Sequence, residues 1–282
     1  MLIIYNLFYI QRFNRTLAVM KLKMTFFLLL SSFFVFAQAE SETTELIDEI
    51  TINADTFIGY DKFDFLYFIK DNALFKVKDH ISVTYKNLAL GQITKVDLLN
   101  PLKIIVFYER FNTAVTLDNQ LNETLKINFS ELKTPLVVSK IGIASQNQLW
   151  VFDEITSQLY LYDTGNGTLK SVGTPLSESI VFYNSDFNYF EWMDKSKNWY
   201  QCSVFGTVKK LDYAFNFDSI LYSDNEQIFY KKEGKVLIFN RNTIKISSIE
   251  NIDKTFKSLT FKNQILSIFT NKGISNFKIT KP

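Results

Sequence analysis

The sequence predicts an all-β protein, a six-bladed β-propeller closed by strand exchange between the two ends of the chain. Three observations predict this fold: strand-forming residues are abundant, one pattern of strands and polar turns recurs six times, and a spare strand at the start of the domain matches a missing strand at its end. With 28 Phe and 14 Tyr, 16% of the 282 residues are aromatic. This composition favours pleated strands, and no segment shows sustained helical periodicity.

The first 39 residues predict a secretory signal peptide. Lys21 and Lys23 precede an apolar run over residues 26–36, and Ala37-Gln38-Ala39 supplies a small-x-small cleavage site. The apolar run is shorter than the roughly 20 residues that cross a hydrocarbon core. We therefore expect cleavage after Ala39, or after Ala37 as the second choice, with no stable membrane span left. The alternative is an uncleaved N-terminal anchor.

Residues 40–282 are predicted to form a single exported domain, located in the periplasm or outside the cell. The apolar residues before Met20 have no evident role, so translation is expected to start at Met20 or Met24. Removing residues 1–39 leaves 27 basic and 29 acidic side chains, a net charge of about −2. This charge argues against a nucleic-acid partner. The single cysteine, Cys202, cannot form an internal disulfide, so stability must come from the core.

The clearest repeat lies in the middle of the chain. A strand over Ile141 to Ala144, a polar turn, a strand over Leu149 to Phe152, and a third strand over Leu159 to Tyr162 predict a meander. The pattern recurs five more times, with second strands at Leu66–Ile69, Ile104–Tyr108, Tyr189–Met193, Ile228–Tyr230 and Ile265–Phe269. Their spacing of roughly 37 to 45 residues is the range of propeller blades. Asn, Asp and Ser are expected to form most of the turns, because the chain has only 9 Gly.

The ends of the domain complement each other. Most units contain a fourth strand, but the last unit stops after its third, at Ile274–Ile279. An additional strand over Leu46 to Asn53 precedes the first unit, and its isoleucines and Leu46 are expected to contact the core. Pairing of the two segments would close the propeller and remove an exposed sheet edge. Two packed sandwiches of the same strands are the alternative.

Catalytic and metal motifs are scarce. His80 is the only histidine, which argues against most metal sites and acid–base pairs, and no Ser lies in a Gly-x-Ser-x-Gly elbow. Asp153, Glu154 and Asp163 lack the spacing of a calcium loop and are interpreted as turn residues. No catalytic residue, metal site or cofactor is therefore predicted.

The turns between second and third strands are the predicted interaction surface, because they are charged where the opposite turns are mostly Asn and Ser. The candidate binding residues there are Asp71, Glu109, Arg110, Asp194 and Lys195. Most aromatic residues on the strands are expected to pack between blades. Trp192 and Trp199, which flank the charged segment at 194–197, are the exceptions and are candidates for stacking a ligand.

The units at Ile141 to Asp163 and Ile220 to Asn240 resemble the degenerate blades of exported bacterial β-propellers, and Phe36-Ala37-Gln38 is similar to signal-peptide ends of Bacteroidetes cell-envelope proteins. The resemblance covers most of the mature chain and carries no functional residue over. It implies a non-catalytic binding or scaffold protein of the cell envelope, whose partner is an envelope protein or a small ligand. The alternative is a hydrolase or lactonase with acids of the first strands gathered in the propeller channel.

Overall fold

The computed structural model describes residues 40–213, 215–252 and 255–280. Within these ranges the regular structure is β-strands with three short 3₁₀ helices, η1 (Leu88–Leu90), η2 (Glu109–Phe111) and η3 (Phe129–Glu131). No helix in the described part of the chain is long and apolar enough to cross a membrane. The predicted signal peptide and the residues Met20 and Met24 lie outside the described residues.

Four sheets of four strands follow one another along the chain, each an antiparallel meander. The first sheet contains β2(Thr56–Tyr60), β3(Leu66–Lys70), β4(Ala73–Lys78) and β5(Ile81–Tyr85), and the second contains β6(Lys95–Asp97), β7(Ile104–Tyr108), β8(Thr113–Leu117) and β9(Glu123–Asn128). The third contains β10(Val138–Ile143), β11(Gln148–Asp153), β12(Gln158–Asp163) and β13(Leu169–Val172). The fourth contains β14(Ile180–Ser185), β15(Tyr189–Asp194), β16(Trp199–Ser203) and β17(Val208–Leu211).

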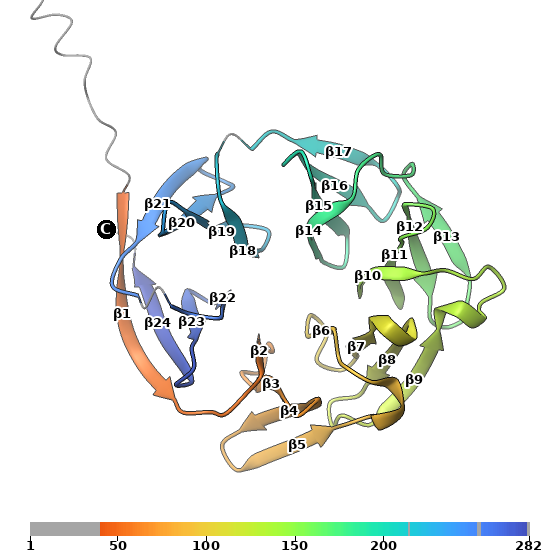
Figure 1. Cartoon of the computed structure of the whole chain (residues 1–282), viewed down its shortest axis with the longest axis horizontal. Helices are drawn as coiled ribbons and strands as arrows, with labels where there is room; N and C mark the ends of the chain where they lie inside the picture. The colour runs from red at the N-terminus through yellow and green to blue at the C-terminus, as the bar shows by residue number, and fades with distance from the viewer. Residues whose placement is uncertain (1–39, 214, 253–254, 281–282) are drawn as a thin grey trace, which may run out of the picture. The chain divides into compact units, whose positions relative to one another are not determined.

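A fifth sheet has eight strands. Its order is β18(Ser219–Ser223), β19(Gln227–Lys232), β20(Lys235–Asn240), β21(Lys245–Ile249), β1(Glu40–Ile50), β24(Ile274–Thr280), β23(Ile265–Phe269) and β22(Ser258–Lys262). The sheets are arranged around a common centre, and the first strand of each meander lies nearest to it (Figure 1). The structure is therefore all-β, as predicted.

Polar residues form the tight hairpins, as their abundance in the sequence predicts. Asp71 and Asn72 have φ values of 49° and 57°, and Asn263 and Gln264 have φ values of 50° and 65°. Positive φ at both central residues defines the type I′ turn, whose twist matches that of the two strands it joins. Asn and Asp tolerate this conformation better than other residues with a side chain.

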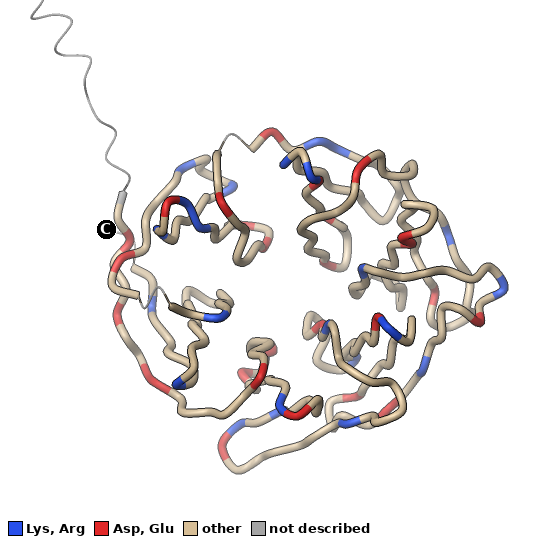
Figure 2. Tube along the Cα trace, in the orientation of Figure 1, with Lys and Arg blue, Asp and Glu red and all other residues tan. Residues whose placement is uncertain are grey.

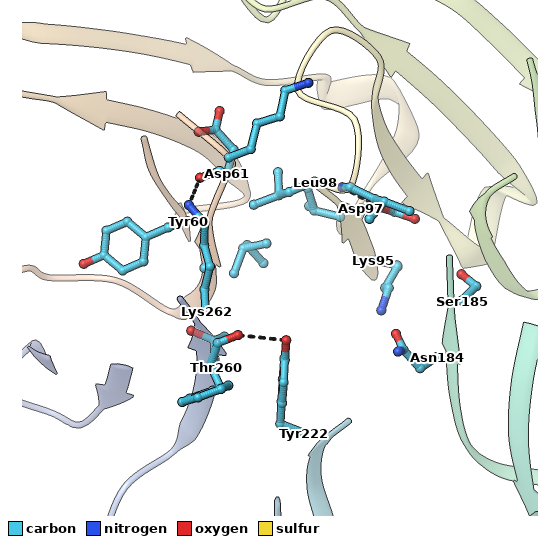
Figure 3. Close-up of a pocket in the computed structure, with 16 residues that line it drawn as sticks. Tyr60, Asp61, Lys95, Asp97, Leu98, Asn184, Ser185, Tyr222, Thr260 and Lys262 are labelled. Carbon is cyan, nitrogen blue, oxygen red and sulfur yellow. Dashed lines mark hydrogen bonds between the residues drawn. The ribbon is translucent and has the colours of Figure 1, made fainter. Parts of the chain in front are cut away.

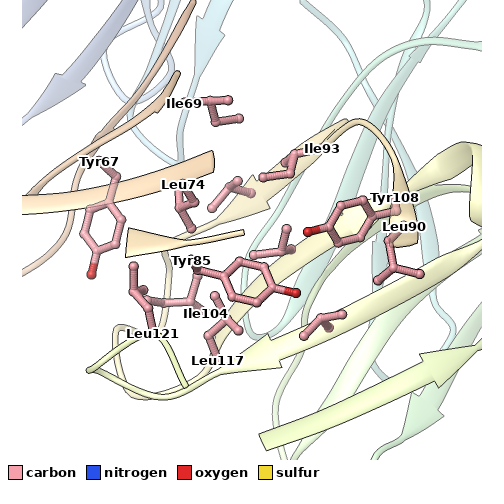
Figure 4. Close-up of a cluster of buried hydrophobic side chains, with 13 residues drawn as sticks. Tyr67, Ile69, Leu74, Tyr85, Leu90, Ile93, Ile104, Tyr108, Leu117 and Leu121 are labelled. Carbon is pink, nitrogen blue, oxygen red and sulfur yellow. The ribbon is translucent and has the colours of Figure 1, made fainter. Parts of the chain in front are cut away.

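Buried side chains of consecutive sheets form the core. Figure 4 shows one such cluster, in which Tyr67 and Leu74 of the first sheet pack with Ile104 and Tyr108 of the second. Equivalent clusters join each later pair of meanders. A sixth cluster unites Phe57 and Leu66 of β2 and β3 with Phe269 and Ile274 of β23 and β24, so the first and last meanders also share a core.

The N-terminal strand β1 connects two parts of the fifth sheet. Residues 43–50 pair antiparallel with Ile274–Thr280, which confirms the predicted pairing of this segment, and residues 40–42 pair in parallel with β21. The strand runs from Glu40 to Ile50, earlier in the chain than the predicted Leu46 to Asn53. Leu46 and Ile47 are 50% and 51% exposed, so the expectation that both contact the core is wrong. Ile50 and Ile52 do pack against the sixth cluster.

Candidate functional site

The first strands of the meanders surround a cavity of about 350 Å³. Residues of β2, β6, β14, β18 and β22 line it, and in Figure 3 their side chains approach one another from separate sheets. Its polar and charged lining consists of Tyr60, Asp61, Lys62, Lys95, Asp97, Asn184, Ser185, Tyr222, Thr260 and Lys262. We call it the channel cavity.

The two acids of the channel cavity act as caps for the backbone. Asp61 Oδ1 accepts hydrogen bonds from the N–H groups of Phe63 and Phe65 at 2.8 and 3.1 Å, and Oδ2 accepts from the Tyr67 hydroxyl at 3.0 Å. Asp97 Oδ1 accepts from Leu99 N–H and Oδ2 from Ile143 N–H, both at 2.9 Å. All four carboxylate oxygens therefore have donors within the protein. Both carboxylates therefore accept hydrogen bonds from the protein itself, whereas a general base must accept a proton from a substrate.

Two of the three lysines of the cavity are exposed to solvent. Lys95 is exposed, its amino group lies 5.1 Å from the ring centre of Tyr183, and Figure 3 shows it directed toward Asn184. Lys62 is exposed too, with its amino group 5.1 Å from the Phe63 ring centre. Lys262 donates to the Asp61 carbonyl and, at 2.7 Å, to Asp64 Oδ1.

Polar side chains also tie neighbouring first strands together around the cavity. Tyr222 donates to the Phe261 carbonyl at 2.9 Å, and Asn184 donates to the Ser223 carbonyl at 2.9 Å. Burial raises the pKa of Tyr222, so its hydroxyl stays protonated and remains a donor at neutral pH. These bonds hold the walls of the cavity in place.

The turns that join first to second strands gather at one end of the meanders. Hydrogen bonds link them in sequence: Ser145 N–H to the Phe187 carbonyl at 2.7 Å, Asn225 Nδ2 to Asp186 Oδ2 at 2.9 Å, and Lys262 to Asp64. We call the surface formed by these turns the first-turn face. It carries large exposed apolar side chains, namely Phe63, Leu99, Leu102, Phe187, Tyr189 and Ile265. Of these side chains, Leu99 also lines the channel cavity.

The binding residues predicted from the sequence lie on the turns between second and third strands. Asp71, Glu109, Arg110 and Lys195 are exposed there. Asp194 is buried, and its Oδ1 accepts from Asn198 N–H at 2.8 Å, so this carboxylate stabilises its own turn. The structure does not place these residues beside the channel cavity.

Trp192 and Trp199 are inside the protein, with 3% and 2% of their surface exposed. The Trp192 ring stacks on Tyr200 at 5.3 Å, and the Trp199 ring packs edge-on against Tyr213 at 5.6 Å. Neither ring has a free face, so the expectation that they stack a ligand at the surface does not fit this structure. Their location matches the packing between blades that was expected of the other aromatic residues.

The sequence analysis missed Lys95 and Lys262, because their importance depends on first strands that are far apart in the chain. Along the described chain, Lys and Arg positions alternate with Asp and Glu positions around the whole ring of sheets (Figure 2). Among the described residues, no group of three or more His, Cys, Asp and Glu is placed to hold a metal ion.

No protein-family model and no curated protein matches the sequence. Solved structures do match, among them streptogramin B lyase, with a TM-score of 0.55 and 11% identity over 86% of this chain and 100% of the other. A catalytically inactive virginiamycin B lyase from Staphylococcus aureus with quinupristin gives 0.55 and 10% over 84% and 100%. A member of the DUF4221 family from Bacteroides vulgatus gives 0.55 and 10% over 87% and 98%.

Identities this low show the fold alone. The chain shares an all-β, propeller-like repeat fold with these proteins. Because both a lyase and a family without a stated activity use this fold, function must be argued from the residues of this chain.

Proposed function

We propose that this protein is an exported, non-catalytic binding or scaffold protein of the cell envelope, a six-bladed propeller that binds a protein partner on its first-turn face. The observation that carries the proposal is the combination, at one end of the domain, of exposed apolar side chains with a channel cavity whose acids are already capped. Such a surface can bind a partner, and the two carboxylates of the channel cavity, Asp61 and Asp97, are already held by donors of the protein.

The pairing of β1 supports six blades and a closed arrangement. Strands β18 to β21 form one complete four-stranded meander, and β22 to β24 become four-stranded once β1 is added. The core cluster shared by β2, β3, β23 and β24 then joins the sixth blade to the first. With both ends of the chain held in one sheet, no long edge of β24 is exposed to another molecule.

The residues of this chain support the non-catalytic part of the proposal. The inactive S. aureus enzyme is a variant in which one histidine is replaced by alanine. In the present chain, His80 is the only histidine, and it lies on the exposed turn between β4 and β5, outside the channel cavity. An enzyme of the hydrolase or lactonase class would need other groups, and the channel acids Asp61 and Asp97 hold backbone N–H groups instead.

Affinity capture from the envelope fraction of the source organism tests the proposal. Leu102→Glu combined with Phe187→Glu places two charges on exposed positions of the first-turn face, and we expect loss of captured partners. The matched control, Glu109→Lys combined with Arg110→Glu, alters the opposite turns and should leave capture unchanged. If capture is instead lost in the Glu109 and Arg110 variant and kept in the Leu102 and Phe187 variant, the partner binds the turns between second and third strands that the sequence predicts. Hydrolysis of esters or lactones that disappears in Lys95→Met would contradict the non-catalytic proposal.

A further inference from the structure

The charged groups that line the channel cavity differ in what they already bind. Three lysines and two aspartates line it, which leaves an excess of one positive charge. All four oxygens of Asp61 and Asp97 accept hydrogen bonds from N–H or O–H groups of the protein. The ammonium groups of Lys62 and Lys95, in contrast, have no hydrogen-bond acceptor and no ion-pair partner among the described residues. The cavity therefore presents unpaired charged donors, while its own carboxylates are occupied.

An aromatic side chain of a different sheet positions the ammonium group of Lys95. The Lys95 nitrogen lies 5.1 Å from the ring centre of Tyr183, and Figure 3 shows it directed toward Asn184. The Tyr183 hydroxyl donates to the Ile141 carbonyl at 3.2 Å, and the ring stacks on Phe190 with a centroid distance of 5.5 Å. Because the ring is held at its hydroxyl and at its face, it is a fixed surface for the cation. The ring attracts the charge of Lys95 but leaves its N–H groups available to a ligand.

Two hydroxyl groups add neutral donors to the cavity. Ser185 of β14 and Thr260 of β22 line it, and neither side-chain hydroxyl has a hydrogen-bond partner among the described residues. Gly142 of β10 makes room for Ser185, because a Cβ at position 142 would lie 1.9 Å from Ser185 Oγ. Each hydroxyl can donate one hydrogen bond to a ligand.

The remaining lining is apolar and suits the body of an organic molecule. Ile58, Val96, Leu98 and Phe261 line the cavity together with the charged groups. Its volume of about 350 Å³ is within the range of roughly 300 to 1,000 Å³ of pockets that hold small ligands. Such pockets combine apolar walls with a few polar groups that fix the orientation of the ligand.

We propose that the channel cavity binds an organic carboxylate, whose oxygens accept hydrogen bonds from the Lys95 ammonium group. A carboxylate has acceptors only, so it complements unpaired donors, and a hydrogen bond between two charged groups is about twice as strong as one between neutral groups. Its single negative charge matches the excess of one positive charge in the lining, whereas a phosphate monoester carries about two. The carboxylate belongs to a small molecule or to an acidic residue of the partner, and in the second case the inference rests on the proposed function.

Benzoate and benzamide, which are similar in size but differ in charge, test the inference by NMR on methyl-labelled protein. Benzoate should shift the methyl signals of Ile58 and Val96, with a dissociation constant on the order of 1 mM. Benzamide should bind about tenfold more weakly, because it is neutral and cannot form a hydrogen bond between two charged groups. Equal affinities of the two probes, or no shift of these signals with benzoate, would overturn the proposal.

Two variants locate the charge that binds the probe. Lys95→Met removes the ammonium group and keeps an unbranched side chain, so it should weaken benzoate binding about tenfold and leave the affinity for benzamide unchanged. Lys126→Met is the matched control, because Lys126 is exposed on β9, at the other edge of the same sheet as β6, and does not line the cavity. It should leave the benzoate affinity unchanged. Benzoate binding that is equal in Lys95→Met and the wild type, or equally weakened in both variants, would refute the assignment of Lys95.

Partner capture by Lys95→Met identifies the source of the carboxylate. If benzoate binds the wild type and the variant loses the partner, the carboxylate is an acidic residue of that partner. If benzoate binds and the variant keeps the partner, the carboxylate is that of a small molecule. Both results support a carboxylate site in the channel cavity.

Failure of this inference can be told apart from failure of the proposed function. Loss of partner capture in the first-turn-face variants without benzoate binding would support the proposed function and reject the carboxylate site. Benzoate binding in the channel cavity with capture unaffected by the first-turn-face variants would do the opposite.

Discussion

Arg241 and Glu191 form a buried, bidentate ion pair between two sheets, with Nη1–Oε2 and Nη2–Oε1 distances of 2.6 Å. Glu191 belongs to β15, and Arg241 directly follows β20. Both side chains are less than a tenth exposed. The guanidinium also donates to the Tyr213 hydroxyl at 2.7 Å, so one side chain fixes the spacing of three segments.

Glu191→Gln should therefore lower the free energy of unfolding by about 3 to 5 kcal/mol, because it removes the directly hydrogen-bonded partner of a buried guanidinium. Guanidinium chloride denaturation of the two proteins measures the difference. Asp64→Asn is the control, because it breaks the exposed Lys262–Asp64 pair and keeps a residue that tolerates a φ of 62°. The control should cost at most about 1 kcal/mol. Equal effects of the two variants would contradict the role assigned to Arg241.

Asp224 gives a prediction for pH dependence. Burial raises the pKa of its carboxyl group, against the opposing effects of the N–H groups of Glu226 and Gln227 and of Arg241. The folded state therefore binds the proton more tightly than the unfolded state, and stability falls as pH rises from the unfolded pKa through the folded pKa. Asp224→Asn keeps an acceptor for both N–H groups and removes the buried charge. It should melt higher than the wild type at pH 7 and equally near about pH 2.5, where the acid is protonated in both states.

Asp118 should behave in the opposite way. Hydrogen bonds from the Asn122 side chain and backbone lower the pKa of its carboxyl group, so the ionised form favours folding above the unfolded pKa. Asp118→Asn should melt lower than the wild type at pH 7, and the difference should shrink as pH falls through the folded pKa. Changes of the same sign in the melting temperatures of Asp224→Asn and Asp118→Asn at pH 7 would contradict this account.

Most strands could be predicted from the sequence because each hairpin is bounded by residues that tolerate tight turns, such as Asn147 before β11 and Asp163 at the end of β12. Which individual residues are exposed could not be predicted from the sequence. Along β15, Phe190, Glu191, Trp192 and Met193 are all buried, because neighbouring sheets cover both faces of the strand. Alternation then carries no information about which side chain meets solvent.

The sites were harder to predict than the fold for a related reason. The channel cavity is built from first strands that are far apart in the sequence, and its contact between Lys262 and Asp64 forms only where the first and last meanders meet. Their separation in the sequence gives no local signal. The charged turns at Asp71 and Glu109 were visible in the sequence because each is a continuous segment.

Deleting residues 43–50 from a chain that begins at Glu40 should destabilise the whole domain. The deletion removes the antiparallel pairing with Ile274–Thr280 and exposes the edge of β24. We expect a fall in melting temperature of about 10 °C or more and association of the protein on gel filtration. An unchanged melting temperature and a monomeric elution volume would contradict both the closure by β1 and the six-bladed arrangement.

The prediction of export concerns the residues before Glu40, which lie outside the described structure. Mass spectrometry of protein purified from the source organism should find an N-terminus at Gln38 or Glu40 in the soluble envelope or extracellular fraction. An N-terminus at Met20 or Met24 in the membrane fraction would show that the apolar run at residues 26–36 acts as an anchor.

Gly273, just before β24, allows β1 to approach, and its replacement should loosen the contact between the ends of the chain. Its φ is +137°, and a Cβ there would lie 2.1 Å from the Ile50 carbonyl oxygen. Gly273→Ala combines an unfavourable backbone conformation with a collision against main-chain atoms, so we expect a loss of about 3 kcal/mol or more in unfolding free energy. Gly234→Ala is the matched control, because Gly234 has a φ of +73° and no atom within 4 Å of the added Cβ. It should cost about 1 kcal/mol, from backbone strain alone. Chemical denaturation of both variants provides the comparison, and a Gly273→Ala protein as stable as the control would show that β1 is not packed against this residue.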